Sequence, residues 1–201
     1  MKPEVLLEIL AQAGKLKTTT RHCFTAPGRK ESVADHSWRM ALMALLLAQD
    51  PPYSSLNMNK VIAMCLIHDL GESFTGDIPT FVKTEQDRTE ETFALTNWVQ
   101  ELPQAQRLLF TELFAEMEQK QTQEAKIYKA LDRLEAVISH NESDLDTWLP
   151  QEYDLQYTYG AEDVKFSPQL TQLKKAIDAQ TTAREKIKFD YNVRKKIENQ
   201  S

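Results

Sequence analysis

Two nearly uninterrupted apolar segments constrain the fold of this chain more than any other feature. Met40 to Ala48 contains nine apolar residues in a row, and Val61 to Ile67 contains seven. Pro51-Pro52 lies between them and ends the first, because proline cannot continue a helix. Both segments are far too short to cross a bilayer. A helix that is apolar over most of its surface is normally buried, so the two segments predict central helices.

Helical periodicity continues through most of the chain. Ser32 can cap the helix that contains the first apolar segment, because Asp35 follows it as in a capping box. Segments 15–31 and 144–166 show no clear period and predict irregular structure, and glycine (5 residues) is too scarce for a turn-rich all-β fold. The sequence therefore predicts an all-α protein. The expected helices cover 4–14, 32–48, about 57–73, 85–101, 103–120, 123–142 and 168–178, followed by a charged tail over 182–201 that is either helical or frayed.

The length of the chain predicts a single domain over residues 1–201. Its core is expected at about 16–142, followed by a C-terminal loop and helices over 143–201. The net charge of -6 argues against a nucleic-acid polymer as partner, because polyanion binding needs a basic face. A small anion can still bind beside a local cation or a metal.

The N-terminus and the cysteines predict a cytoplasmic protein without a membrane partner. Residues 1–4 carry an acidic residue ahead of a short apolar stretch, which is not the pattern of a signal peptide. Cys23 and Cys65 form neither a metal-binding spacing nor a disulfide framework. Cys65 lies within the second apolar segment, so we expect it to be buried as a small hydrophobic residue.

The dipeptide His68-Asp69 is the strongest indication of chemistry. It directly follows the apolar segment that ends at Ile67. A carboxylate and an imidazole at the end of a buried helix are costly unless they are paired or bind a metal. Nitrogen and carboxylate ligands together favour Mn, Co, Zn, Fe or Ni over Ca or Mg. The dipeptide therefore predicts a site for one divalent transition metal, without identifying which.

His36 and Asp132 are the residues that can complete such a site. His36 lies in the first turn of its apolar helix, and Asp132 lies beside the apolar stripe of helix 123–142. Neither position requires a metal. Asp132 can form a surface ion pair with Lys129, and His36 can contact the adjoining loop. Spacing alone leaves these structural roles and metal binding equally open.

The order of these residues resembles the HD-domain superfamily of metal-dependent phosphohydrolases. It is most similar to the bacterial 5′-deoxynucleotidase branch and the related HD-domain 5′-nucleotidases. An His-Asp dipeptide alone is weak evidence, but its combination with Glu72 and the Gly-Asp-Ile-Pro turn is specific. The resemblance implies a single compact helical bundle, and such proteins are commonly homodimers. The matching stretches lie at 16–21, 31–37, 68–72, 75–80 and 131–136.

The resemblance also implies roles for individual residues. Glu72 and Asp77 match the two catalytic carboxylates that act on the water and the leaving group, in an order that the sequence does not decide. Arg21 matches an arginine that binds the substrate phosphate, a role that suits its guanidinium fork. Without these roles, Glu72 would be an exposed last-turn residue, Asp77 a turn former and Arg21 a solvated cation. The implied metal ligands are His36, His68, Asp69 and Asp132.

These observations predict a phosphomonoesterase acting on a (deoxy)nucleoside 5′-monophosphate, a small phosphorylated substrate. One alternative is the same chemistry on a nucleoside triphosphate or an alarmone, which the scarcity of lysine and arginine around the motifs disfavours. Another is a non-enzymatic, metal-stabilised binding module, which has no use for the spare carboxylates Glu72 and Asp77. His22 stands where close relatives carry tryptophan, so the base and sugar preference stays open. The aromatic residues of 144–166 can stack on a base or pack a satellite core.

Overall fold

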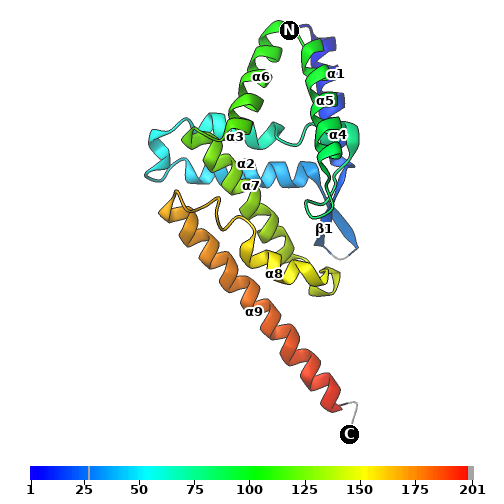
Figure 1. The fold of residues 1–201 in the computed structure, drawn as a ribbon, viewed down its shortest axis with the longest axis vertical. Coiled ribbons are helices and arrows are strands. Elements are labelled where there is room, and N and C mark those ends of the chain that lie inside the picture. Colours follow the sequence, from blue (N-terminus) through cyan, green and yellow to red (C-terminus); the bar gives the residue numbers. More distant parts are fainter. Residues whose placement is uncertain (27, 199–201) are drawn as a thin grey trace. The chain divides into compact units, whose positions relative to one another are not determined.

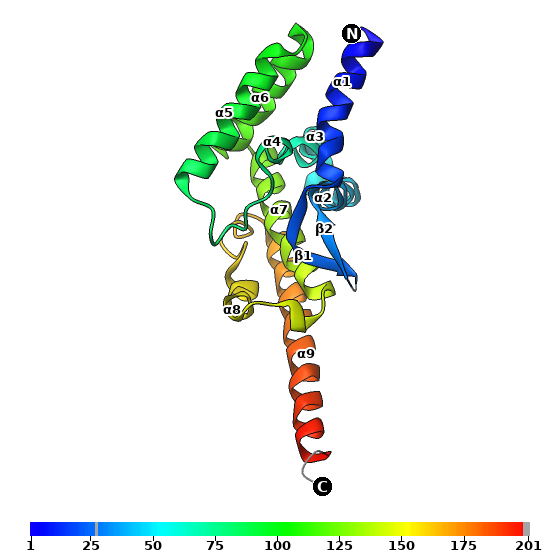
Figure 2. The same ribbon diagram turned by 90° about the vertical axis from the view of Figure 1, so that its right-hand side faces the viewer.

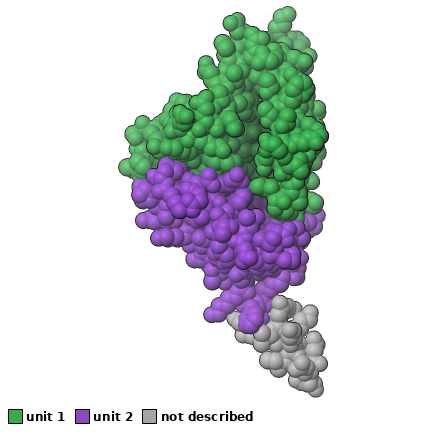
Figure 3. Space-filling model, viewed as in Figure 1, with its two compact units in different colours: residues 1–22, 30–132 green, residues 23–29, 133–201 purple. Residues whose placement is uncertain are grey.

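The computed structural model describes the backbone of residues 1–26 and 28–198 and the side chains of residues 1–25 and 28–189. Within them, the chain forms helices and a short β-hairpin (Figures 1 and 2). Its contacts divide it into two compact units, which Figure 3 colours separately. Unit 1 contains residues 1–22 and 30–132, and unit 2 contains residues 23–29 and the chain from Arg133 onwards.

Unit 1 consists mainly of helices. The helix α7 begins in unit 1 and continues into unit 2, and the hairpin strands are likewise shared between the units. The two strands pair with each other in a two-stranded sheet. The helices of unit 1 are α1 (Pro3–Gly14), the 3-10 turn η1 (Lys15–Lys17), α2 (Val33–Leu47), the 3-10 turn η2 (Tyr53–Ser55), α3 (Met58–Ile67), α4 (Glu72–Thr75), α5 (Glu85–Glu101), α6 (Gln104–Gln119) and the start of α7 (Gln123–Glu142). Unit 1 also contains the first residues of β1 (Thr20–Ala26), up to 22, and those of β2 (Arg29–Ser32) from 30 onwards.

The helix α2 begins where the sequence predicts. The Ser32 hydroxyl accepts a hydrogen bond from the Asp35 amide, and the Asp35 carboxylate accepts one from the Ser32 amide. This reciprocal pair satisfies two of the amides that every helix start leaves without an intrahelical partner. The predicted capping box is confirmed, and it fixes the first turn of α2, which carries His36.

The core of unit 1 lies between α2 and α3, which are side by side (Figure 1). Met40 and Ala44 of α2 are fully buried, as are Val61, Met64 and Cys65 of α3. The burial predicted for Cys65 is confirmed. The expectation that α2 is central holds for one face only, because its apolar residues Trp38, Leu42, Leu45 and Leu46 are exposed.

Two segments of unit 1 differ from the predicted helices. The segment 15–31 contains the β-hairpin, although its sequence shows no alternating pattern. The predicted helix 57–73 ends at Ile67, and a tight turn over residues 68–71 separates α3 from α4. In that turn the amides of Glu72 and Ser73 bond to carbonyls three residues earlier, those of Asp69 and Leu70. The turn places His68, Asp69 and Glu72 at the junction of two helices.

Unit 2 has a small core of its own. Its elements are the tip of the hairpin, the rest of α7, η3 (Leu145–Thr147), α8 (Pro150–Thr158) and α9 (Pro168–Glu198). Trp148 is buried, donates its indole N–H to the Ser143 hydroxyl and packs against Tyr153. The aromatic residues of 144–166 were expected either to stack on a base or to pack a satellite core, and Trp148 packs in the core. The helix α9 continues past its predicted end at 178 to Glu198, and residues 199–201 of the predicted tail lie outside the described residues.

None of the described helices combines the length and the apolarity that a membrane span requires.

Candidate metal centre and its surroundings

The orientation of His68 is set by the end of α3. His68 is the C-cap residue of this helix, and its amide bonds to the Met64 carbonyl. Its ring Nδ1 lies 2.9 Å from the carbonyl oxygen of Cys65. A carbonyl only accepts hydrogen bonds, so Nδ1 carries a proton, and in the neutral ring Nε2 presents a lone pair. This is the backbone contact that typically orients a metal-binding histidine.

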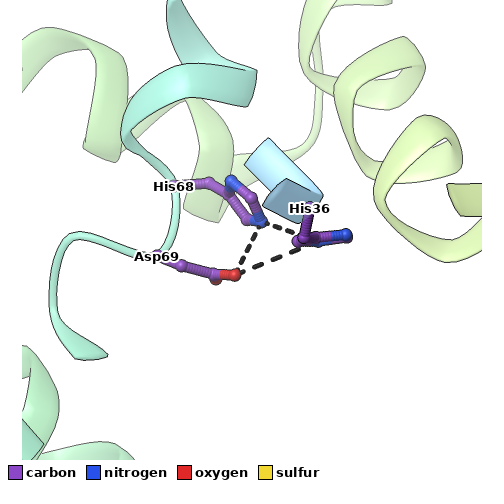
Figure 4. A group of neighbouring side chains, drawn as sticks. All are labelled: His36, His68 and Asp69. Atoms are coloured by element: carbon purple, nitrogen blue, oxygen red, sulfur yellow. Dashed lines mark hydrogen bonds and ion pairs between the residues drawn. The ribbon is translucent and has the colours of Figure 1, made fainter. Parts of the chain in front are cut away.

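Three of the predicted ligands converge on one point (Figure 4). The Nε2 atoms of His68 and His36 lie 3.3 Å apart. Oδ2 of Asp69 lies 2.9 Å from Nε2 of His68 and 4.0 Å from Nε2 of His36. The three side chains come from α2, from the C-cap of α3 and from the turn that follows it.

Asp132 of α7 faces the same point and also forms the ion pair with Lys129. Its Oδ1 lies 3.3 Å from Nε2 of His36 and 3.9 Å from Nε2 of His68. Its Oδ2 accepts a hydrogen bond of 2.6 Å from the Lys129 ammonium group. The ion pair and a metal contact are therefore compatible for Asp132, because each uses a different carboxylate oxygen.

The donor atoms fit a divalent metal. Ligands that lie about 2.0–2.2 Å from one metal are roughly 3–4 Å from one another, which matches the spacing of these atoms. Two carboxylate oxygens and two imidazole nitrogens face each other here. A shared cation satisfies them together, and neutral imidazole plus carboxylate suits a transition metal.

Both carboxylates of the centre are held in the ionised form. Burial alone would raise the pKa of Asp69, but the adjacent His68 and His36 hold it at about 2. Burial likewise acts to raise the pKa of Asp132, yet Lys129 and the two histidines hold it well below its usual range. Ionised carboxylates are the form that binds a metal.

Glu72 lies beside this centre and is buried, with 6% of its surface exposed. The suggestion that it is an exposed last-turn residue is therefore wrong. Burial, together with the charges of Asp69, Asp77 and Glu91, raises the pKa of Glu72 to about 10 in the metal-free protein. Its Oε1 lies 3.9 Å from the Lys83 ammonium group, whereas its Oε2 is buried without a hydrogen-bond partner among the described residues.

Asp77 and Arg21 approach the same region from a turn and a strand. Asp77 follows Gly76, whose φ of 82° favours glycine. Burial raises the pKa of Asp77, and the charge of Arg21 opposes that rise. Arg21 is not a solvated loop residue, because it lies in β1 and its Nε is 3.1 Å from Oε2 of Glu31.

Sequence reasoning did not find the charged residues around these carboxylates. Lys83 pairs with Glu91 of α5 and approaches Glu72. Glu31 is buried between Arg21 and Arg39. The capping box of Thr84 and Asp87 could have located the start of α5, and with it the position of Lys83. No spacing rule could have identified the partner of Lys83.

Comparison with known protein families gives one match over most of the chain. A family model described as HD domain matches residues 13–174. The match includes residues of both units, while a single domain over residues 1–201 stays a prediction.

Named relatives and solved structures agree with this match. The mouse protein named 5′-deoxynucleotidase HDDC2 is 34% identical over 185 residues, which cover 89% of each chain. The human protein of the same name is 33% identical over 181 residues, covering 87% of this chain and 85% of its own. A crystal structure from Magnetospirillum magnetotacticum, described as a predicted metal-dependent phosphohydrolase, has a TM-score of 0.75 at 27% identity and covers 90% of this chain and 96% of its own.

Proposed function

Because the chain belongs to the HD-domain family, we propose that it is a metal-dependent phosphohydrolase that removes phosphate from a (deoxy)nucleoside 5′-monophosphate. One observation carries the proposal. The side-chain nitrogen and oxygen atoms of His36, His68, Asp69 and Asp132 converge beside Glu72, whose Oε2 is buried without a partner among the described residues. The names of the relatives support the choice of substrate.

His36, His68, Asp69 and Asp132 would hold the metal. When bound, the metal supplies Lewis-acid chemistry and an activated water at neutral pH. Its identity among Mn, Co, Zn, Fe and Ni is not fixed by these ligands.

The remaining site residues would bind the substrate and move protons. Arg21, oriented by its ion pair with Glu31, binds the phosphate. Water attacks phosphorus and the bond from phosphorus to the 5′-oxygen breaks. Glu72 and Asp77 divide the proton transfers, so that one proton leaves the water and one reaches the departing 5′-oxygen. The products are the nucleoside and inorganic phosphate.

A triphosphate or alarmone substrate is less well matched to the charges of the site. The cations near the centre already face carboxylates: Arg21 faces Glu31, Lys83 faces Glu91, and Lys129 faces Asp132. Among the described residues of the site, little positive charge beyond Arg21 is therefore left for a larger phosphate chain.

The proposal is tested by measuring phosphate release from the common ribo- and deoxyribonucleoside 5′-monophosphates with Co, Mn or Zn. We expect turnover by the wild type and a loss of at least about a hundredfold in Asp69→Ala, because removing even a residue that only supports a metal ligand typically costs ten- to a hundredfold. Asp50→Ala, which removes an exposed carboxylate after α2, is the matched control and should keep full activity. Absence of turnover with every metal and nucleotide would reject the proposal. Release of triphosphate or pyrophosphate from nucleoside triphosphates and alarmones assayed alongside would favour the larger substrates.

We also propose that the protein forms a homodimer through the exposed face of α2. Trp38 (62% exposed), Leu42 and Leu45 (52% exposed) follow one another at helical spacing on that face. Contiguous exposed apolar residues typically mark an interface. Leu45→Glu should convert the dimer to a monomer in sedimentation analysis, while Phe93→Glu, at an exposed apolar residue of α5, should not. A wild-type monomer at micromolar concentration would contradict this assignment.

A further inference from the structure

Lys83 is fixed by the backbone on both sides. The amides of Val82 and Lys83 both bond to the Pro79 carbonyl and close a turn before it. Directly after it, Thr84 caps α5 in a reciprocal capping box with Asp87. The backbone from which the Lys83 side chain starts is therefore fixed, and only the side chain itself remains to be ordered.

The ammonium group of Lys83 is held by Glu91. Glu91 lies on α5, and its Oε2 accepts a hydrogen bond from Lys83. Glu91 in turn lies close to the turn between α3 and α4, because a Cβ at Gly71 would be 2.7 Å from its Cγ. Burial acts to lower the pKa of Lys83, but Glu91, Glu72 and Asp69 raise it, so the side chain stays positively charged.

The two oxygens of Glu72 have different surroundings. Oε1 lies 3.9 Å from the Lys83 ammonium group. Oε2 is buried and has no hydrogen-bond partner among the described residues. Buried polar atoms nearly always have a partner in the working protein, so Oε2 is the atom that is free to take one at the site.

We propose that Lys83, held by Glu91, is a positioning residue that orients the Glu72 carboxyl group through Oε1 and thereby leaves Oε2 to exchange the proton during hydrolysis. The inference rests on the proposed function. Lys83 acts on Glu72 and does not need to touch the substrate, so its loss should reduce the rate of the chemical step and leave substrate binding intact.

The first test measures kcat and KM for the wild type, Lys83→Met, Lys83→Arg and Lys60→Met with one deoxynucleoside 5′-monophosphate. Lys60 is the matched control because it forms a comparable ion pair with Glu116, at 3.0 Å, on α3 and α6. We expect Lys83→Met to lower kcat by roughly tenfold to a hundredfold with KM within about twofold, a part of what a positioned general acid or base contributes. Lys83→Arg should recover part of that loss, and Lys60→Met should match the wild type.

Two outcomes would overturn the role of Lys83. A higher KM with unchanged kcat would show that Lys83 binds the substrate itself, and unchanged values of both would show that it is not needed. Full activity in Glu72→Gln would instead reject the role of Glu72 in the proposed function, which separates the two failures.

A second test does not depend on turnover. Crystal structures of the wild type and Lys83→Met would show the orientation of the Glu72 carboxyl group directly. We expect it to turn away from its wild-type position in Lys83→Met, while His68 and Asp69 stay in place. A Glu72 side chain that keeps its position without Lys83 would reject the inference even if no substrate were turned over.

Discussion

At the scale of single residues, Gly71 shows how closely α5 approaches the turn between α3 and α4. Its φ is not in the left-handed region, so the backbone does not require glycine there. The requirement is space, because an added Cβ would be 2.7 Å from Cγ and 3.1 Å from Oε1 of Glu91. Glu91 is a flexible side chain and would move, which would disturb its hydrogen bond with Lys83.

We therefore expect Gly71→Ala to lower kcat about as much as Lys83→Met does, while the protein stays folded. Gly14→Ala is the matched control, since its Cβ would meet nothing within 4 Å. That helical substitution should be neutral or stabilise the protein by about 0.5–1 kcal/mol. The check is kcat together with the urea midpoint of both variants. Wild-type kcat in Gly71→Ala would mean that the approach of Glu91 has no catalytic consequence.

The residues of the proposed metal centre could be predicted from the sequence, whereas those around it could not. His68-Asp69 was identifiable because a polar dipeptide at the end of an apolar helix needs a physical reason. Lys83, Glu91 and Glu31 lie in segments rich in charged residues, where a buried ion pair leaves no local pattern. Their pairing depends on which helices meet, and that is a property of the folded chain.

At the scale of elements, the start of α2 couples local sequence to the site. Ser32 is the N-cap, and His36 lies in the first turn that this cap fixes. The turn between α3 and α4 likewise positions the side chains of His68 and Asp69 at the site.

Replacing Ser32 by alanine should lower the free energy of unfolding by about 1 kcal/mol, the usual cost of losing an N-cap. It should also weaken metal binding, because the first turn of α2 frays. Asn57→Ala is the control: Asn57 caps α3 at the end opposite His68, so it should cost stability without affecting the metal. Urea unfolding in chelator and a metal titration measure the two effects. Equal metal affinity in both variants would show that the cap does not position His36.

The elements that were predicted correctly have strong local signals, and those that were missed do not. The Ser32 capping box located the start of α2, and helical periodicity located α5 and α6. The hairpin was missed because β2 is exposed at its first half and buried at its second, which removes the alternation expected of a strand. The end of α3 at Ile67 was missed because a tight turn of four residues need not differ in amino-acid composition from the helix before it.

At the scale of the whole molecule, the burial of Glu72 makes metal-free stability depend on pH. The pKa of Glu72 is raised from 4.5 to about 10 in the folded protein, so the folded state holds a proton that the unfolded state has released. Stability then falls as pH rises through that interval. The pKa of Asp69 is lowered from 3.8 to about 2. Its ionised form therefore stabilises the folded protein by a constant amount above about pH 3.8, and this does not change the slope between about pH 5 and about pH 9.

In chelator, we expect the free energy of unfolding of the wild type to decrease between about pH 5 and about pH 9, and that of Glu72→Gln to decrease less. The variant should therefore be the more stable protein at the alkaline end. Glu112→Gln, which removes an exposed carboxylate on α6, should follow the wild type. Urea unfolding at several pH values gives the curves, and parallel curves for all three proteins would contradict the expectation.

The ion pair between Lys129 and Oδ2 of Asp132 bears on which ions the centre can accept. Since that oxygen already accepts a hydrogen bond, Oδ1 is the oxygen that Asp132 presents to His36. Calcium takes about six to eight oxygen ligands, often through two-oxygen contacts with a carboxylate. We therefore expect the ion pair with Lys129 to disfavour a two-oxygen contact by Asp132, and so to favour smaller ions that accept imidazole. A lysine that touches no metal would then contribute to ion selectivity.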